Sequence, residues 1–159
     1  MCGMKVRRYQ PGDGDFVSAI FFAAARRTGR QAYSERQVQA WAPAPYDAAE
    51  YDELAADGRI LLVAVDDQDR PVAWADLETN GHIDHIFCHP ESGRRGAGTA
   101  LYERIEQLAR ELKLQRLYVE ASEIAKPFFE RQGFRVIDRR DFEIGGVPIH
   151  NYAMDKTLY

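Results

Sequence analysis

The chain has 159 residues, which suffices for one domain with a substantial core and is short for two. Hydrophobic residues make up 45% of it and charged residues 29%, as is ordinary for a soluble globular protein. The net charge of −4 argues against a general nucleic-acid binder, because contacts with phosphates need a basic surface.

The cysteines and the apolar runs of the sequence indicate where the protein works. Cys2 and Cys88 are the two cysteines, and they form no C-x-x-C pair. A disulfide framework or a cysteine zinc site is therefore not expected, and a reducing cytoplasm fits. No apolar run approaches the ~18 residues of a membrane-spanning helix, and the N-terminus lacks the apolar segment of a signal peptide. We expect one cytoplasmic domain over residues 1–159, without membrane or nucleic-acid partners.

The first part of the chain combines one predicted strand with three predicted helices. Residues 5–9 have the pattern of a strand that ends at a Pro-Gly breaker. Apolar residues at helical spacing then predict a helix that ends at Gly29. Ser34 and Gln37 form a capping-box pattern, which indicates the start of a second helix. A third, short helix is expected over residues 48–56.

The rest of the chain is dominated by strands. They are predicted over residues 59–66, 71–78, 82–88, 116–120, 134–144 and 148–156, with a helix after the third and after the fourth. The strand–helix–strand crossover from Ile83 to Glu120 lies within an otherwise antiparallel arrangement. The expected fold is α/β, with a mixed, mostly antiparallel central sheet of about seven strands flanked by helices on both faces.

A glycine-rich turn, Gly93 to Gly98, links the third of these strands to the following helix. Such a turn presents unpaired backbone N–H groups and the positive end of the helix dipole, which together can bind a phosphate. Arg94 and Arg95 add two permanent positive charges. Gly96 and Gly98 let a ligand approach the backbone closely, because they have no side chain. The turn therefore predicts a ligand that carries phosphate or pyrophosphate.

Two further motifs follow the glycine turn. Ser122 to Ala125 precedes the segment Phe129 to Phe134, and Asn151 to Lys156 lies in the last predicted strand. Gly93 to Gly98 is similar to the signature Gln/Arg-x-x-Gly-x-Gly/Ala. Together the three segments resemble the GNAT superfamily of acetyl-CoA-dependent N-acetyltransferases, whose second signature is Asn-x-x-Ala…Tyr-x-x-x-Gly-Phe. The resemblance extends from the first strand to the last and implies a GNAT-like fold.

The resemblance also implies an activity. It implies an acyltransferase that moves an acetyl group from acetyl-CoA to an amine-bearing acceptor, a small molecule or a peptide, without a metal. The strand before the turn would meet the pantetheine arm, and the turn and helix start would hold the pyrophosphate. The implied cofactor-binding residues are Ile86, Phe87, Cys88, Arg94, Arg95, Gly96, Ala97, Gly98, Thr99, Ser122 and Phe129. A homodimer is compatible with the sequence, because C-terminal strands often pair subunits in this family.

Three positions depart from the family pattern. Gly93 stands where Gln or Arg is usual, although the two neighbouring arginines keep the turn basic. Ser122 replaces the usual Asn and keeps a hydroxyl that can meet the pantetheine arm. Phe129 stands where many members have the Tyr proposed to protonate the departing thiolate, so the sequence does not identify the general acid. Tyr118 is an alternative hydroxyl on the strand after the helix, and water is another proton source.

The strand before the turn supplies the candidate base. Acetyl transfer needs a neutral amine, and a carboxylate or histidine near the thioester can accept its proton, directly or through a water. The resemblance places Asp84 where some members have a catalytic Glu on this strand. Alternation puts Asp84 on one face with His82 and Ile86, and His85 on the other. Asp84 is the predicted catalytic residue, and the two histidines are weaker candidates because a strand histidine is more commonly exposed.

The acceptor site has fewer signals. In the resemblance, the first two helices wall off the acceptor, which makes Tyr33 and Trp41 candidate substrate-binding residues. Trp41 can equally be a core aromatic. Glu78 and Glu120, with Asp76, lie on central strands, where they can attract a cationic amine or simply face solvent.

Two other functions remain open from the sequence. In a dinucleotide-binding oxidoreductase, Gly96 and Gly98 would open the helix and Glu120 would bind a ribose. Against this, Leu101 occupies the third glycine position and no further strand–helix–strand units follow. The other alternative is a CoA-binding sensor or interaction module with little catalysis. It would be consistent with Phe129 in place of the Tyr that is proposed to protonate the thiolate.

Overall fold

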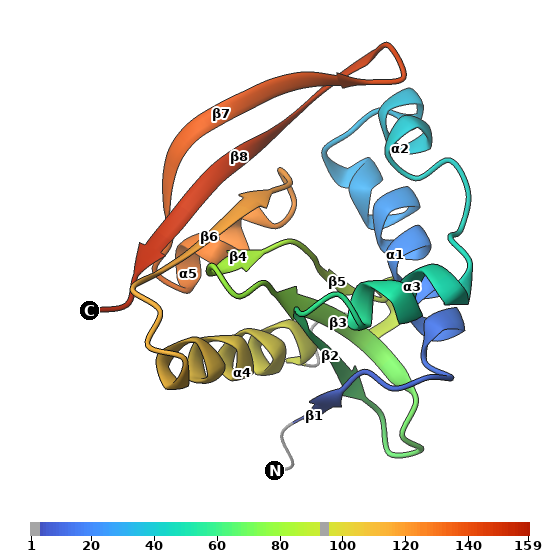
Figure 1. Ribbon diagram of the computed structural model, residues 1–159. Helices are drawn as coiled ribbons and strands as arrows, with labels where there is room; N and C mark the ends of the chain where they lie inside the picture. Colours follow the sequence, from blue (N-terminus) through green and yellow to red (C-terminus); the bar gives the residue numbers. More distant parts are fainter. Residues whose placement is uncertain (1–3, 93–95) are drawn as a thin grey trace.

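The computed structural model describes residues 4–92 and 96–159, which form eight strands, five α-helices and two short 3₁₀ helices (Figure 1). The strands are β1 (Lys5–Arg8), β2 (Ile60–Val65), β3 (Pro71–Leu77), β4 (His82–Ile83), β5 (Ile86–Cys88), β6 (Arg116–Ala121), β7 (Arg135–Ile144) and β8 (Val147–Thr157). The helices are α1 (Gly14–Arg26), η1 (Thr28–Gln31), α2 (Glu35–Trp41), α3 (Ala48–Ala55), η2 (Pro90–Ser92), α4 (Ala97–Glu111) and α5 (Lys126–Arg131). The predicted elements all occur, and most of their ends agree to within a residue or two.

The strand predicted over residues 82–88 is broken in two, and this break divides the sheet. Strands β1, β2, β3 and β5 pair antiparallel in that order, while β4, β6, β8 and β7 form a second group in which β4 runs parallel to β6. Between β4 and β5, the backbone N–H groups of Asp84 and His85 donate to the Asp76 carboxylate instead of to a neighbouring strand, at 3.0 and 2.7 Å. The predicted alternation of side chains along residues 82–88 is therefore wrong at this point.

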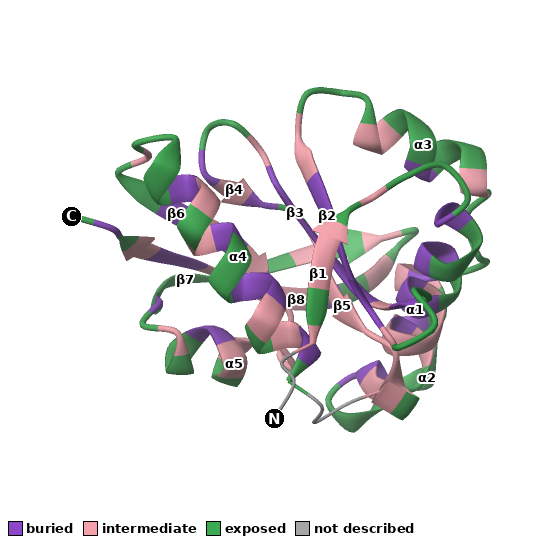
Figure 2. Ribbon diagram, turned by 90° about the horizontal axis from the view of Figure 1, so that it is seen from below, coloured by how far each residue is buried: buried purple, intermediate pink, exposed green. Residues whose placement is uncertain are grey.

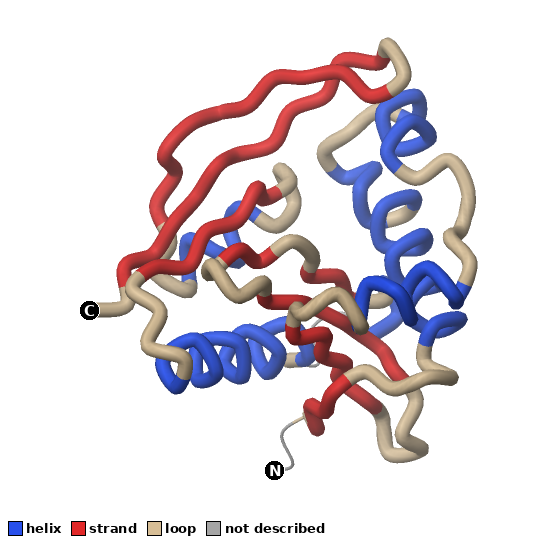
Figure 3. The backbone as a smooth tube through the Cα atoms, viewed as in Figure 1, coloured by secondary structure: helices blue, strands red, loops and turns tan. Residues whose placement is uncertain are grey.

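The break makes the two sheets diverge. Strand β5 stays with β3, whereas β4 pairs with β6 only through Tyr118 and Val119. The later part of β6 therefore has β8 as its neighbour on one side and no strand on the side facing β5. Figure 3 shows the loop that separates β4 from β5 near the middle of the fold. We call the region between β5 and β6, next to the start of α4, the wedge between the two sheets.

Helices cover both faces of the first sheet. Helix α4 packs on one face of β2 and β3, and α1 and α3 pack on the other (Figures 1 and 3). Figure 2 accordingly shows β2 and β3 as mostly buried. This explains why residues 60–65 form a continuous apolar run rather than an alternating one. None of the helices in residues 4–92 and 96–159 has the length and apolar character of a membrane span.

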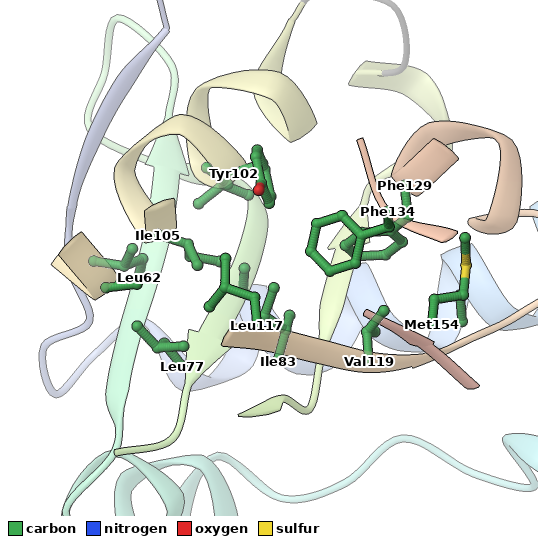
Figure 4. Packing of buried hydrophobic residues seen from close by; sticks show 14 of the residues in the cluster. Leu62, Leu77, Ile83, Tyr102, Ile105, Leu117, Val119, Phe129, Phe134 and Met154 are labelled. Atoms are coloured by element: carbon green, nitrogen blue, oxygen red, sulfur yellow. The ribbon is translucent and has the colours of Figure 1, made fainter. Parts of the chain in front are cut away.

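Helix α4 anchors the larger core. Its buried residues recur at helical spacing and include Leu101, Tyr102 and Ile105. Tyr102 and Ile105 lie against residues from both sheets and α5 (Figure 4). Leu112, the residue after the end of α4 at Glu111, is exposed. The core side chains labelled in Figure 4 are Leu62, Leu77, Ile83, Tyr102, Ile105, Leu117, Val119, Phe129, Phe134 and Met154.

The hairpin of β7 and β8 reaches from the second sheet to α2 (Figure 1). Its tip is held by polar and apolar contacts with the N-terminal helices. The Tyr33 hydroxyl donates to the carbonyl of His150 at 2.8 Å and accepts from the N–H of Glu123 at 2.7 Å. Tyr33 and Val38 form a small buried cluster with Ile149. The hairpin thus closes over the region between α2 and the central strands.

A glycine fixes the turn that leads into β4. Gly81 has φ +98°, a conformation that residues with a side chain rarely adopt. Its N–H donates to the Glu78 carbonyl at 3.0 Å, and its own carbonyl accepts from the Tyr118 N–H at 3.0 Å. A Cβ at this position would collide with the backbone carbonyl of Arg116. The first and second sheets are therefore joined at a point where only glycine fits.

Candidate active site

Two pockets adjoin at the wedge between the sheets. The smaller pocket, about 210 Å³, is lined by Ala24, Thr28, Gly29, Trp41, Ile86, Phe87, Cys88, Gly98, Ser122, Ile124, Ala125 and Phe128. The larger pocket, about 570 Å³, is lined by Phe21, Tyr33, Trp41, Tyr46, Glu50, Tyr51, Leu54, Trp74, Asp84, His85, Phe87, Glu120, Ser122, Arg140, Phe142, Ile144, Ile149, His150 and Asn151. Trp41, Phe87 and Ser122 line both, so the two pockets meet at these side chains.

Five of the eleven predicted cofactor residues line the smaller pocket. Ile86, Phe87 and Cys88 of β5 line it, together with Gly98 and Ser122. Ala97 is buried at the start of α4, with Gly96 before it and Thr99 after it. The predicted pyrophosphate contacts Arg94 and Arg95 lie outside the described residues.

Phe129 was predicted to face the cofactor, and the structure places it elsewhere. Its side chain is 0% exposed and packs against Phe134 in the core, with ring centroids 5.0 Å apart. The pocket is lined by the preceding residue, Phe128. Successive residues of a helix point about 100° apart, so only one of the two can face the pocket. The sequence motif located the helix correctly and assigned the wrong phenylalanine.

Cys88 also lines the smaller pocket. Burial raises the pKa of its thiol, and a hydrogen bond from the Gly98 backbone only partly opposes this effect. A thiol with a raised pKa carries little thiolate, so this position is poorly suited to nucleophilic catalysis. The cysteine is better understood as a small apolar wall of the pocket.

The predicted acceptor residues divide between the larger pocket and its surroundings. Tyr33, Trp41 and Glu120 line the pocket. Glu78 does not line it; its carboxylate contacts His82 at 3.0 Å and Arg59 at 3.1 Å. Tyr118, the alternative hydroxyl, lines neither pocket and accepts a hydrogen bond from Asn80 instead.

In the larger pocket, the imidazole of His85 contacts the buried carboxylate of Asp76. Asp76 is 0% exposed, and its Oδ2 lies 2.8 Å from His85 Nδ1 and 2.7 Å from Arg59 Nη1. Arg59 also contacts Asp84 at 3.0 Å, and both Asp84 and His85 line the pocket. The role of Asp76 is left open by the sequence pattern, although an aspartate between Ala75 and Leu77 in an apolar strand indicates a buried partner.

The electrostatics of this cluster determine which ring nitrogen of His85 carries a hydrogen. Burial raises the pKa of Asp76, but hydrogen bonds and charges from His85 and Arg59 outweigh it, so the pKa is lowered. An ionised carboxylate only accepts hydrogen bonds, so His85 must carry a hydrogen on Nδ1. In the neutral ring Nε2 is then left with its lone pair, and it has no hydrogen-bond partner among the described residues. This is the arrangement of a histidine ready to accept a proton.

The same three side chains have the spacing of a metal site. Donor atoms of Asp76, Asp84 and His85 lie within 4.8 Å of one another. The Arg59 guanidinium, however, lies within hydrogen-bond distance of both carboxylates and places a positive charge between them. These two carboxylates are therefore already engaged in an ion-pair network.

His82 links the two sheets beside this network. Its ring contacts Glu78 at 3.0 Å and Glu120 at 2.7 Å and stacks on Tyr118, with centroids 4.8 Å apart. Burial lowers the pKa of His82, but the two carboxylates more than offset this effect, so the pKa is raised. The folded state therefore binds this proton more tightly than the unfolded chain does.

This proton makes the stability contribution of His82 depend on pH. The contribution is complete below the unfolded pKa of about 6.5 and is lost as the pH rises through the raised folded value. We expect His82→Gln to destabilise the protein more at about pH 6 than at about pH 9, as measured by urea unfolding. The control is His89→Gln, since His89 accepts a hydrogen bond from the Glu91 N–H and pairs with no carboxylate in the described structure. Equal losses for His82→Gln at both pH values would contradict the expectation.

Comparison with known proteins identifies the class and then the family. A GCN5-related N-acetyltransferase from Rhodopseudomonas palustris has a crystal structure with a TM-score of 0.90 and 34% sequence identity, covering 99% of this chain and 98% of that one. An uncharacterized N-acetyltransferase, YafP of Escherichia coli (strain K12), is 34% identical over 154 residues, which are 97% of this chain and 96% of the relative. These matches place the protein among the acyltransferases.

Residues 30–156 match the acetyltransferase (GNAT) domain family, and the chain belongs to that family. A structure of the PaiA N-acetyltransferase from Thermoplasma acidophilum, in complex with coenzyme A, shares the fold with a TM-score of 0.79 at 14% identity. It covers 99% of this chain and 100% of that one. The predicted family, mixed fold and enzyme class are confirmed.

Proposed function

We propose that the protein transfers an acetyl group from acetyl-CoA directly to an amine, with His85 as the general base. The observation that carries this proposal is the junction of the two pockets at Trp41, Phe87 and Ser122. A donor in the smaller pocket would present its thioester there to an acceptor in the larger pocket. Two structural relatives were solved with acetyl-CoA and another with coenzyme A, which supports this choice of donor.

The smaller pocket suits the pantetheine arm. Strand β5 is the last strand of its sheet, so within the described part of the chain the edge that faces the wedge has no strand partner. Its free N–H and C=O groups can pair with the amides of the arm, as a sheet edge pairs with an added strand. The first turn of α4 lies at the same place and offers N–H groups to the pyrophosphate. We assign Arg94 and Arg95 to the pyrophosphate on their charge and position in sequence.

The reaction can be written with the groups at the junction. The amine attacks the thioester carbonyl, a backbone N–H of β5 stabilises the oxyanion, and His85 Nε2 accepts the amine proton. The C–N bond forms, the C–S bond breaks, and the thiolate leaves. The Ser122 hydroxyl accepts a hydrogen bond from the Ala125 N–H at 3.1 Å, and its own hydrogen is free to donate to the sulfur. The thiolate finally takes a proton from solvent or from His85.

Asp84 is the competing base. It lines the larger pocket, and its Oδ2 lies 3.0 Å from Arg59 and 3.6 Å from His85 Nδ1. Its Oδ2 is thus already engaged as the acceptor of a hydrogen bond from the Arg59 guanidinium. His85 has an uncommitted nitrogen, and the geometry therefore favours it over the residue that the sequence pattern selected.

The donor site can be tested at Gly98. A Cβ there would lie 3.5 Å from Cys88 Sγ and 3.5 Å from the Phe128 ring, so a leucine side chain would extend into the smaller pocket. We expect Gly98→Leu to weaken CoA binding by about tenfold or more and to abolish acetyl transfer, while leucine still favours the helix. The measurements are calorimetric titration with CoA and thiol release from acetyl-CoA over a panel of amines.

Glu103→Leu is the matched control, because Glu103 is exposed on the same helix and lines neither pocket. It should leave both quantities unchanged. Tight CoA binding by the native protein without transfer to any amine would favour the sensor function over the enzyme. Unchanged CoA binding by Gly98→Leu would place the donor elsewhere.

A further inference from the structure

We infer that the acceptor is an arylalkylamine, an uncharged aromatic ring joined by a short chain to the amino group. This inference rests on the proposed function and specifies its substrate. It is drawn from the larger pocket, where the surface left for a ligand is aromatic and the charged groups already have partners.

The aromatic side chains of the larger pocket form one continuous surface. Phe21 is its hub, with ring centroids 4.9 Å from Phe87, 5.9 Å from Tyr46 and 6.2 Å from Trp41. From this hub further ring contacts lead to Tyr51, Trp74, His85, Tyr33 and His150. The surface therefore runs from the pocket junction to the proposed base, and a flat ring can stack along it.

The charged groups of this pocket are engaged within the protein. Asp84 pairs with Arg59, and Glu120 contacts His82. The Glu50 carboxylate accepts from the Asp47 N–H in the cap of α3, at 3.0 Å. Arg140 donates to Asn151 at 3.0 Å, and its guanidinium lies 5.4 Å from the Phe142 ring centroid. These contacts occupy part of the hydrogen-bonding capacity of each charged group, which favours a substrate whose remainder is an uncharged ring.

The test compares amines that differ mainly in the ring. We expect kcat/KM for phenethylamine to exceed that for propylamine by about 30-fold, because the ring is buried on binding. It should exceed that for cyclohexylethylamine by about fivefold, because stacking rewards an aromatic ring over a saturated one of similar size. Equal or better use of cyclohexylethylamine or propylamine would overturn the inference while leaving the acetyltransferase function intact.

A binding measurement separates the inference from turnover. Trp41 and Trp74 are the two tryptophans of the chain, and both line the larger pocket. Phenethylamine should therefore change the intrinsic fluorescence of the complex with CoA, and propylamine at the same concentration should not. Binding of phenethylamine without acetylation would support the substrate class and contradict the proposed reaction. Absence of any phenethylamine binding would overturn the substrate class.

A pair of exposed aromatic residues provides matched variants. Tyr46 is 48% exposed and stacks on Phe21, whereas Phe16 is 42% exposed and lines neither pocket. Tyr46→Leu should lower the ratio of kcat/KM for phenethylamine to that for cyclohexylethylamine by about threefold. Phe16→Leu should leave this ratio unchanged. A ratio that responds equally to both substitutions, or to neither, would contradict a role for the aromatic surface.

Discussion

Replacing His85 by glutamine is expected to lower kcat for acetyl transfer by about 10²–10⁴-fold, since the amine proton then has no acceptor at the reacting atoms. Glutamine can still contact Asp76, so the ion-pair network and the break between β4 and β5 should persist. CoA affinity should stay within about twofold of the native value, because His85 lines the larger pocket and not the smaller one. Steady-state kinetics and calorimetry measure the two quantities.

The matched variant for this prediction is Asp84→Asn. It removes the charge beside Arg59 and keeps the shape of the side chain, so the loss of kcat should be less than about tenfold. Free imidazole should partly restore activity to His85→Ala, an effect that a purely structural histidine would not show. If Asp84→Asn instead gives the larger loss and His85→Gln a small one, the base is Asp84, as the sequence pattern had indicated.

The largest expected effect on stability comes from a single methyl group at Gly81. Gly81→Ala should lower the free energy of unfolding by about 3 kcal/mol or more, because the Cβ meets the Arg116 carbonyl in a backbone conformation that alanine disfavours. The carbonyl belongs to β6, so the clash would push apart the two sheets that the turn joins. Chemical denaturation of purified protein measures the loss.

Gly58→Ala is the control, since Gly58 has a similar φ of +106° but open space where the Cβ would lie. It should cost about 1–2 kcal/mol from backbone strain alone. Losses of the same size at Gly58 and Gly81 would show that the contact with Arg116 contributes nothing and that conformation accounts for both.

The elements around the proposed donor site could be predicted because their signals are local. The glycines before α4, the apolar spacing of that helix and the capping box of Ser34 and Gln37 each act within a few residues. In the structure Pro127 lies in the first turn of α5, and Gly133 follows the end of the helix with φ +96°, which are positions that local sequence rules favour for these residues. Such features fix elements and their order, and so they also fix the family resemblance.

The preference for His85 over Asp84 could not be predicted, because it depends on contacts between distant parts of the chain. Nothing within residues 82–88 shows that the strand breaks at Asp84, since the cause is the side chain of Asp76 on another strand. Nor does the sequence show that Arg59 supplies the charge that makes a buried Asp76 tolerable. Alternation assumes that each N–H meets a neighbouring strand, and here two of them meet a carboxylate.

The hydrogen bond between Tyr33 and His150 has a consequence for biosynthesis. It joins positions 117 residues apart, near the beginning and near the end of the chain. Contacts of such long range form only after the intervening chain has been made. A chain still growing on the ribosome can assemble the first sheet and α4, and with them much of the donor pocket, while the acceptor pocket lacks its far wall. We therefore expect the growing chain to be able to bind CoA before it can bind the acceptor amine.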